Sequence, residues 1–184
     1  ILGNLTTQGD LFFDLQNSAD TTETGTLPGG IIDGNGTVAV TVTGNIVSGS
    51  IGEFAVLNND FRFLDTGGSI LGNATVDLSA AGISTTGFFQ PLVNNTNGFI
   101  GGDASINVAV AGDINVGAQT FFNILNTGGQ IGNDALSTLT AANYASESTF
   151  QFQILNNNGS IGGNAILDAS LSGSLTSLGD AFIQ

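Results

Sequence analysis

Hydrophobic and polar residues alternate in short runs along this chain, and the runs recur at nearly constant intervals. Each of six segments begins with an isoleucine, passes through small residues to an Asn or Asp, and then alternates: ILGN at 1, IDGNGTVAV at 32, ILGNATVDL at 70, IGGDASINV at 100, IGNDALSTL at 131 and IGGNAILDA at 161. Successive starts differ by 31, 38, 30, 31 and 30 residues. This period predicts a tandem repeat in which every unit occupies an equivalent place in a stacked structure.

The residues after each isoleucine follow the two-residue period of a β-strand with one buried face. In the unit that starts at Ile70, the small Ala74 is followed by Val76 and Leu78, with the polar Asp77 between them. A second alternating segment precedes each following isoleucine and ends in a turn rich in Asn and Gly, residues that tolerate a left-handed backbone. The variable stretch between these two strands predicts a third short strand or a loop.

The pattern as a whole predicts an all-β fold. No segment has a convincing helical period, and the chain contains 28 glycines, which disfavour helix. We therefore predict one β-solenoid domain (a parallel β-helix) over residues 1–184, with about six coils of roughly 30 residues each. Two irregular stretches, near 18–30 and near 45–61, predict protruding loops, and such loops are where specific contacts are most expected.

Charge and composition exclude several classes of function. Fifteen acidic residues face a single basic residue, Arg62, which gives a formal net charge of −14. Such a surface repels phosphate groups, so binding to nucleic acid or to anionic lipid is disfavoured. The chain has no run of 18 apolar residues, so we expect no membrane insertion of this segment. Without Cys or His it lacks thiolate and imidazole chemistry, and we predict a protein that is not an enzyme and needs no cofactor.

The Asn or Asp of each unit forms a column at one corner of the predicted solenoid. We predict that these side chains are a structural ladder joined from coil to coil by hydrogen bonds. The members of the column are Asn4, Asn35, Asn73, Asp103, Asp134 and Asn164. The adjacent carboxylates of Asp103 and Asp134 are the candidate metal ligands, because Ca²⁺ prefers carboxylate and amide oxygens.

A second column, on the outward face of the first strand, consists of Asp77, Asn107, Thr138 and Asp168. Paired carboxylates on such a face would suit a polysaccharide-acting β-helix enzyme, whereas a solvated sheet face is the simpler interpretation.

Phenylalanine is the dominant aromatic residue of the chain. Alignment on the following isoleucine places Phe61, Phe63, Phe122 and Phe152 on the inward phase of the second strand, which predicts an internal aromatic stack rather than a sugar-binding platform. Phe89 and Phe99 are the two that we expect to be exposed.

The repeats resemble those of filamentous-haemagglutinin-type and autotransporter-like bacterial surface proteins, as in ILGNATVDLSA at 70 and NTGGQIGN at 126. Those proteins are long right-handed β-helices of units rich in Gly, Asn and Thr. The resemblance implies a right-handed coil, secretion, display at the cell surface and a role as adhesin, stalk or fibre.

Together these observations predict an extracellular, non-enzymatic structural protein, a segment or subunit of a bacterial surface fibre or adhesin stalk. Its coils would continue end to end, with a further copy of itself as the head-to-tail partner. Because the chain opens on a repeat without an initiator Met or a signal peptide, we expect a piece of a longer or processed precursor. The alternative is a cell-surface binding module that recognises a glycan or a host protein through its loops.

Overall fold

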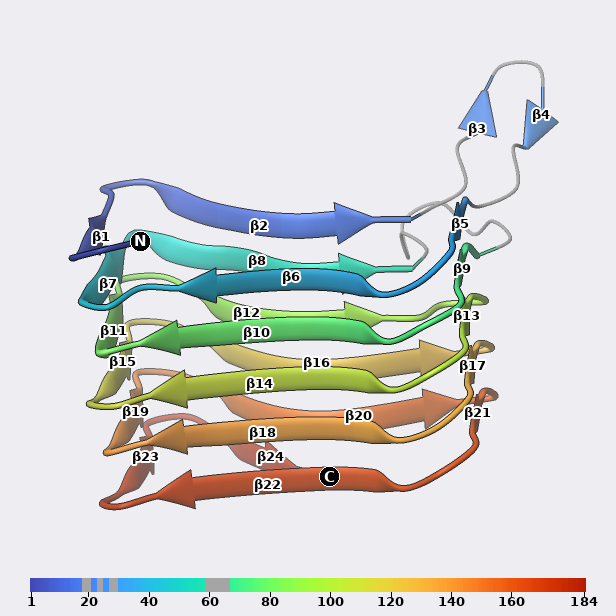
Figure 1. Ribbon diagram of the computed structural model, residues 1–184. Coiled ribbons are helices and arrows are strands. Elements are labelled where there is room, and N and C mark those ends of the chain that lie inside the picture. The colour runs from blue at the N-terminus through green and yellow to red at the C-terminus, as the bar shows by residue number, and fades with distance from the viewer. Residues whose placement is uncertain (18–20, 23–24, 27–29, 59–66) are drawn as a thin grey trace.

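The computed structural model describes residues 1–17, 21–22, 25–26, 30–58 and 67–184 (Figure 1). These residues contain strands but no helix. The strands form four parallel sheets and one separate antiparallel pair. We name the four sheets left, back, right and front after their places in Figure 1.

Two of the sheets have six strands each. The left sheet consists, in spatial order, of β1 (Leu5–Thr6), β7 (Asn45–Ser48), β11 (Gly82–Thr85), β15 (Ile114–Val116), β19 (Tyr144–Ser146) and β23 (Leu175–Ser177). The back sheet consists of β2 (Asp10–Gln16), β8 (Ser50–Leu57), β12 (Phe89–Asn94), β16 (Thr120–Thr127), β20 (Phe150–Asn157) and β24 (Ala181–Ile183).

The other two sheets have five strands each. The right sheet consists of β5 (Ile31–Ile32), β9 (Ser69–Ile70), β13 (Phe99–Ile100), β17 (Gln130–Ile131) and β21 (Ser160–Ile161). The front sheet consists of β6 (Gly36–Thr41), β10 (Ala74–Ala80), β14 (Ala104–Val110), β18 (Ala135–Ala141) and β22 (Ala165–Leu171). The remaining pair, β3 (Thr21–Thr22) and β4 (Gly25–Thr26), stands apart from the four sheets (Figure 1).

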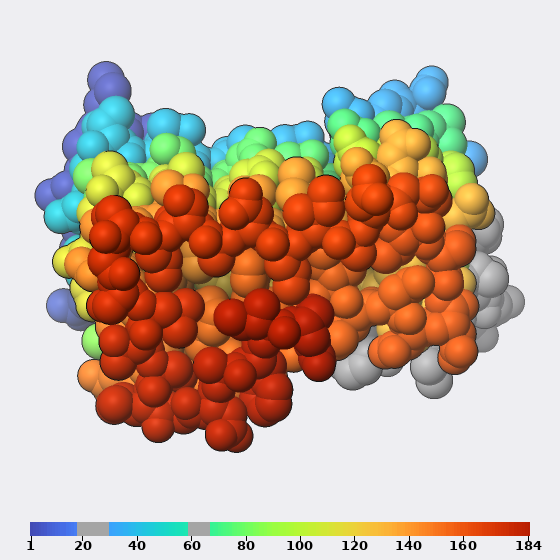
Figure 2. Space-filling model, turned by 90° about the horizontal axis from the view of Figure 1, so that it is seen from below, coloured from blue at the N-terminus to red at the C-terminus, as the bar shows by residue number. Residues whose placement is uncertain are grey.

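The chain visits the sheets in the fixed order left, back, right and front, and we call one such circuit a coil. Equivalent residues of successive coils stand side by side, so that Ile70 pairs with Ile100 and Ile100 with Ile131. Stacked parallel strands in register fit a β-solenoid and confirm the predicted all-β, repeating architecture. The variable stretch between the two predicted strands supplies the strands of the left sheet. Figure 2 shows the end of the stack that the last coil forms.

The small-residue column of the front sheet has a packing reason. Ala74, Ala104 and Ala135 are fully buried, and Gly36 precedes them in the same column. A Cβ placed on Gly36 would lie 3.0 Å from the Cδ1 atom of Ile70, in the next coil. A small side chain therefore fits where the corner isoleucine of the neighbouring coil packs inward.

The interior contains an aromatic cluster centred on Phe122, as the inward phase of the second strand predicts. Its ring lies 5.3 Å from Phe89, 6.2 Å from Tyr144, 6.3 Å from Phe150 and 5.8 Å from Phe152, measured between ring centroids. The expectation that Phe89 is exposed is wrong, because its side chain is fully buried. The preceding residue, Phe88, is exposed instead.

The described part of the stretch 45–61 is not a protruding loop, because Asn45–Ser48 and Ser50–Leu57 form β7 and β8. Residues 59–61 lie outside the described residues. Phe54 and Val56 of β8 stand in register with Pro91 and Val93. They occupy the inward places that alignment on the following isoleucine assigned to Phe61 and Phe63, and both of these lie outside the described residues.

The extra residues of the first two coils enter at one corner, between the back and right sheets. In each later coil, three residues lie between the Asn at this corner and the first residue of the right-sheet strand. These segments are 96–98, 127–129 and 157–159. The equivalent segments are thirteen residues long at 18–30 and ten at 59–68. Of the predicted loop 18–30, the structure describes only the β3–β4 pair and Gly30.

One buried polar group offers a test of the packing. The hydroxyl of Ser137 is buried with no hydrogen-bond partner among the described residues, and its neighbours in the column are Ile106 and Leu167. Ser137→Val should raise the free energy of unfolding by about 1–2 kcal/mol, because it removes an unpaired polar group and adds apolar burial. Urea unfolding measures this change.

The matched control is Ser79→Val, on the exposed face of the same sheet, which should shift stability by less than about 0.5 kcal/mol. A loss of stability in both Ser137→Val and the smaller Ser137→Ala would show that the hydroxyl has a partner after all.

Candidate functional site

The predicted Asn/Asp column exists at the corner between the right and front sheets, and its side-chain Oδ1 atoms link one coil to the next. In each coil a side-chain Oδ1 accepts a hydrogen bond from the backbone N–H of its counterpart in the next coil. The four bonds join Asn35 to Asn73 (2.8 Å), Asn73 to Asp103 (2.9 Å), Asp103 to Asp134 (3.1 Å) and Asp134 to Asn164 (2.6 Å). A carboxylate accepts as well as an amide, which explains why either Asp or Asn can occupy this column.

Asn4 does not belong to this column. Leu5 pairs with Ile46 in the left sheet, so the ILGN segment at the start aligns with residues 42–45 rather than with 32–35. The Oδ1 atom of Asn4 accepts a hydrogen bond of 2.9 Å from the backbone N–H of Asn45. Asn4 therefore begins a separate column at the corner between the front and left sheets.

The structure brings Asp103 and Asp134 into adjacent coils, at a shallow pocket of about 280 Å³ that Gly132 and Gly163 also line. Both carboxylates already accept backbone N–H groups. Within the described ranges there is no group of three or more acidic, His or Cys side chains that could hold a metal ion. Ca²⁺ takes six to eight oxygen ligands, so two carboxylates form only part of such a site, and cation binding here stays a prediction.

A second, buried column of asparagines lies at the corner between the back and right sheets. Each Nδ2 donates to the Oδ1 of the next asparagine in the stack, at distances of 2.8–3.0 Å. Each Nδ2 also donates to the backbone oxygen of the first right-sheet residue in the next coil, at 3.0–3.2 Å. We call this set, Asn17, Asn58, Asn95, Asn126 and Asn156, the inner asparagine ladder.

The inner asparagine ladder needs both ends of the amide, unlike the outer column. Asn58, Asn95 and Asn126 are fully buried, so their donors and acceptors have only protein partners. The sequence contained a signal for it, since an Asn stands before each of these corners. The irregular spacing of 41, 37, 31 and 30 residues, caused by the two insertions, conceals that signal.

The turns behind this ladder adopt the left-handed backbone that their composition predicts. The φ angles are 54° at Asn97, 65° at Gly128 and 54° at Asn158. These are equivalent positions of successive coils. Only Gly and a few polar residues adopt this conformation readily.

The acidic column of the front sheet does not bring two carboxylates together. Asp77 accepts a hydrogen bond of 2.7 Å from Nδ2 of Asn107, whose Oδ1 accepts one of 3.0 Å from Thr138. Asp168 lies one coil further along. Asp77 and Asp168 are thus separated by three strand spacings, about 14 Å, whereas the carboxyl groups of glycosidases lie about 5–9.5 Å apart.

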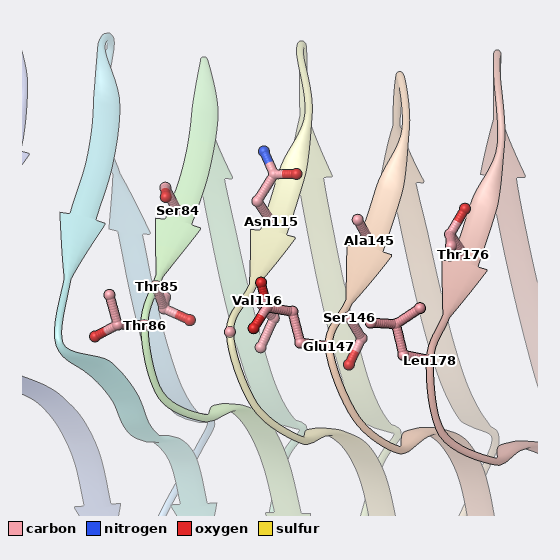
Figure 3. A pocket seen from close by; sticks show the side chains of 11 residues that line it. Ser84, Thr85, Thr86, Asn115, Val116, Ala145, Ser146, Glu147, Thr176 and Leu178 are labelled. Carbon is pink, nitrogen blue, oxygen red and sulfur yellow. The ribbon is translucent and has the colours of Figure 1, made fainter.

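A groove of about 430 Å³ runs along the left sheet (Figure 3). One row of outward side chains comes from successive strands, and a second row follows where each strand ends (Figure 3). The first row is Ser84, Asn115, Ala145 and Thr176, and the second is Thr86, Gly117, Glu147 and Leu178. The groove therefore runs along the solenoid axis, across the strands.

The chemistry of this left-sheet groove is that of neutral hydrogen bonding. Glu147 is the only ionisable residue in its lining. The hydroxyl of Thr85 donates to the backbone oxygen of Gly87 at 3.0 Å, and that of Ser146 to Ala118 at 2.9 Å. The outward Ser84, Asn115 and Thr176 remain directed to solvent. The uncharged polar side chains around Glu147 make the groove suited to holding a polar ligand.

In the part of the chain that the structure describes, no helix is long and apolar enough to cross a membrane. No protein-family model matches this chain, and no curated protein sequence and no solved structure matches it either.

Proposed function

We propose that this chain is a non-enzymatic structural segment of an extracellular bacterial surface fibre or adhesin stalk, in which right-handed solenoid coils continue end to end. The observation that carries this proposal is the register of the stack, because each successive coil adds one strand to the same four sheets. A further coil would pair at the open edge of the last coil, formed by β21, β22, β23 and β24. Each of these strands pairs with a neighbour on one side only. Unpaired strand edges are templates for further strands.

The core is exposed at this open edge. Ile183 of β24 is 62 % exposed, whereas its register partner Phe152 is 1 % exposed. Leu175 of β23 is 37 % exposed, whereas its partner Tyr144 is 1 % exposed. No described residue caps the last coil, whose atoms are red in Figure 2. Another coil placed here would bury these side chains and pair the four strands.

A second copy of these 184 residues does not complete all four sheets at once. The left and back sheets begin with β1 and β2, whereas the right and front sheets begin half a coil later with β5 and β6. If β1 and β2 of a second copy pair with β23 and β24, one strand place stays empty in each of the other two sheets. Coils that continue through this missing half fill every place.

The missing half coil can be supplied from the chain itself. Gln184 is equivalent to Gln153, and Ile1 is equivalent to Leu171, by the pairing of β20 with β24 and of the left-sheet strands. A copy of residues 154–170 appended after Gln184 therefore completes the back strand and adds one right and one front strand. The next copy could then begin with its own Ile1.

The test compares the 184-residue chain with this extended chain by negative-stain electron microscopy over a range of concentrations. We expect the extended chain to form fibres about one coil diameter wide, and the original chain to stay as short particles. The control carries an appended Gly/Ser segment of the same length, which should not form fibres. Single particles of the extended chain at every concentration would contradict end-to-end stacking, and fibres of all three chains would contradict the half-coil requirement.

A cell-surface binding module is the second candidate, and the left-sheet groove favours it. The groove presents uncharged polar side chains along the axis, which suits a neutral, extended ligand such as a glycan. In this case the two inserted segments at the back-to-right corner are further candidates for contacts.

A further inference from the structure

Phenylalanine side chains are exposed on the outer face of the back sheet, where sequence reasoning placed none. Phe12 is 59 % exposed, Phe88 is 45 % exposed and Phe182 is 42 % exposed. Phe121 is half-buried beside Phe88, with 6.5 Å between the ring centroids. We call these four residues the aromatic stripe. Phe88 and Phe121 form the one ring pair of the stripe, and exposed apolar patches mark interaction sites.

The register of the back sheet places the aromatic stripe along the solenoid axis. Phe12 lies over Gly52 of the next strand, where a Cβ would come 2.8 Å from the Cε1 atom of Phe12. Phe182 is in register with Gln151, which is in register with Phe121. The stripe crosses from the first strand of the sheet to the last, about 24 Å at the usual strand spacing. About seven residues of extended chain cover that length.

Carboxylates accompany one end of the stripe. Asp10 and Asp14 flank Phe12 on the outward phase of β2, and both are exposed. Glu53 of the neighbouring strand is in register with Phe12. Acidic groups next to an exposed ring suit a cationic partner, because the ring face attracts a guanidinium or ammonium group and the carboxylates pair with it.

The net charge selects among the possible occupants. Two copies with a charge of −14 each repel one another, which disfavours side-to-side association of the chain through this face. The same charge attracts a basic partner and speeds its encounter. A neutral glycan would gain from the rings but not from the charge.

We propose that the aromatic stripe binds an extended segment of a partner protein that carries Arg or Lys at alternate positions. The rings hold the cationic side chains, and Asp10 and Asp14 form ion pairs at the end near Phe12. Phe182 lies on β24 at the open edge of the last coil, whereas Phe12, Phe88 and Phe121 lie outside that edge, so binding by these three does not depend on fibre formation.

The probe is a fluorescein-labelled peptide of about eight residues, alternating Arg and Gly, with binding followed by fluorescence anisotropy at about 0.15 M salt. We expect Phe12→Leu/Phe121→Leu to weaken binding by about tenfold, because leucine keeps apolar area but loses the ring. Circular dichroism and thermal melting of each variant check that it folds.

The charge contribution is tested with two double variants that change the net charge equally. Asp10→Asn/Asp14→Asn should weaken binding by about tenfold. Asp33→Asn/Asp168→Asn changes two exposed residues away from the back sheet, in the bend after β5 and on β22, and should change binding by less than about twofold. Equal losses in the two double variants would overturn the proposal, since general attraction to an acidic protein would then explain binding. Unchanged binding by the leucine variant would also overturn it. The proposal would also be overturned if a neutral glucan oligomer bound at the stripe and the peptide did not.

Discussion

Asn95→Asp is expected to lower the free energy of unfolding by about 3–5 kcal/mol at pH 7, because it places an unpaired charge in the interior. The amide of Asn95 donates to Oδ1 of Asn126 at 2.8 Å and to the backbone oxygen of Gln130 at 3.1 Å. A carboxylate at this place has no proton to donate and would face both oxygens. Asn58 alone would still donate to it.

The loss should depend on pH in a defined direction. Burial disfavours the charged form, so the pKa of the new carboxyl group is raised in the folded state above its unfolded value of about 3.9. The penalty therefore grows as pH rises above that value and shrinks as pH falls from 7 towards 4. Part of the loss in stability remains at low pH, because the single proton of the neutral carboxyl group can be donated to only one of the two acceptor oxygens.

Asn35→Asp is the matched control, because it makes the same chemical change in the outer column. The Oδ1 atom of Asn35 only accepts, from the backbone N–H of Asn73, and Asp103 and Asp134 occupy equivalent places naturally. Asn35→Asp should lower the free energy of unfolding by less than about 1 kcal/mol. Urea unfolding at pH 7 and pH 4 measures both variants. Equal losses in the two would show that the inner asparagine ladder does not depend on its amide donors.

Alkaline unfolding should be governed by one side chain, the only tyrosine of the chain. The hydroxyl of Tyr144 lies 2.8 Å from that of Thr120, and both are buried. Burial raises the pKa of Tyr144 well above its usual range, and the hydrogen bond with Thr120 offsets this rise only in part. Because the chain has no Lys, His or Cys, little else titrates between pH 9 and pH 12.

The sign of the effect follows from the raised pKa. The unfolded chain loses the tyrosine proton above about pH 10 and the folded chain does not, so stability is complete below pH 10 and falls by about 1.4 kcal/mol per pH unit above it. The loss should approach about 3 kcal/mol at pH 12. Tyrosinate absorbance and circular dichroism should therefore change together, at unfolding.

Tyr144→Phe separates this effect from packing. The variant leaves the hydroxyl of Thr120 without its partner and should be about 1 kcal/mol less stable at pH 7. At pH 12 it should be the more stable protein, because it has no phenol to ionise. Tyrosinate that forms in the wild type near pH 10, while the circular dichroism is still native, would contradict the burial of Tyr144.

The regular part of the fold follows from local chemistry that a sequence displays directly. Alternation placed Val76 and Leu78 inward and Asp77 outward, and the structure confirms this for the front sheet. The isoleucine marks a buried corner in the middle units, at Ile70, Ile100 and Ile131. These features recur about every 30 residues, so alignment of the units reveals the pattern that they share.

The errors arose where the period breaks. The isoleucine at position 1 has the local sequence of a right-sheet corner, yet pairing in the left sheet decides its place, and pairing partners forty residues away are not visible locally. The insertion after Asn58 caused a similar error, because Phe61 was aligned by counting back from the following isoleucine across the inserted residues. The sequence alone did not predict the inner asparagine ladder or the aromatic stripe, because each depends on which coils are neighbours.

The inner asparagine ladder also bears on how such a chain can change over evolutionary time. Asn17 and Asn58 each precede an insertion, and both keep their hydrogen bonds to the next coil. The ladder thus closes the coil before the inserted residues begin and leaves the strands on either side in register. Sequence added at this corner carries little risk to the scaffold, so new recognition segments can be acquired there while the rest of the solenoid keeps its repeat.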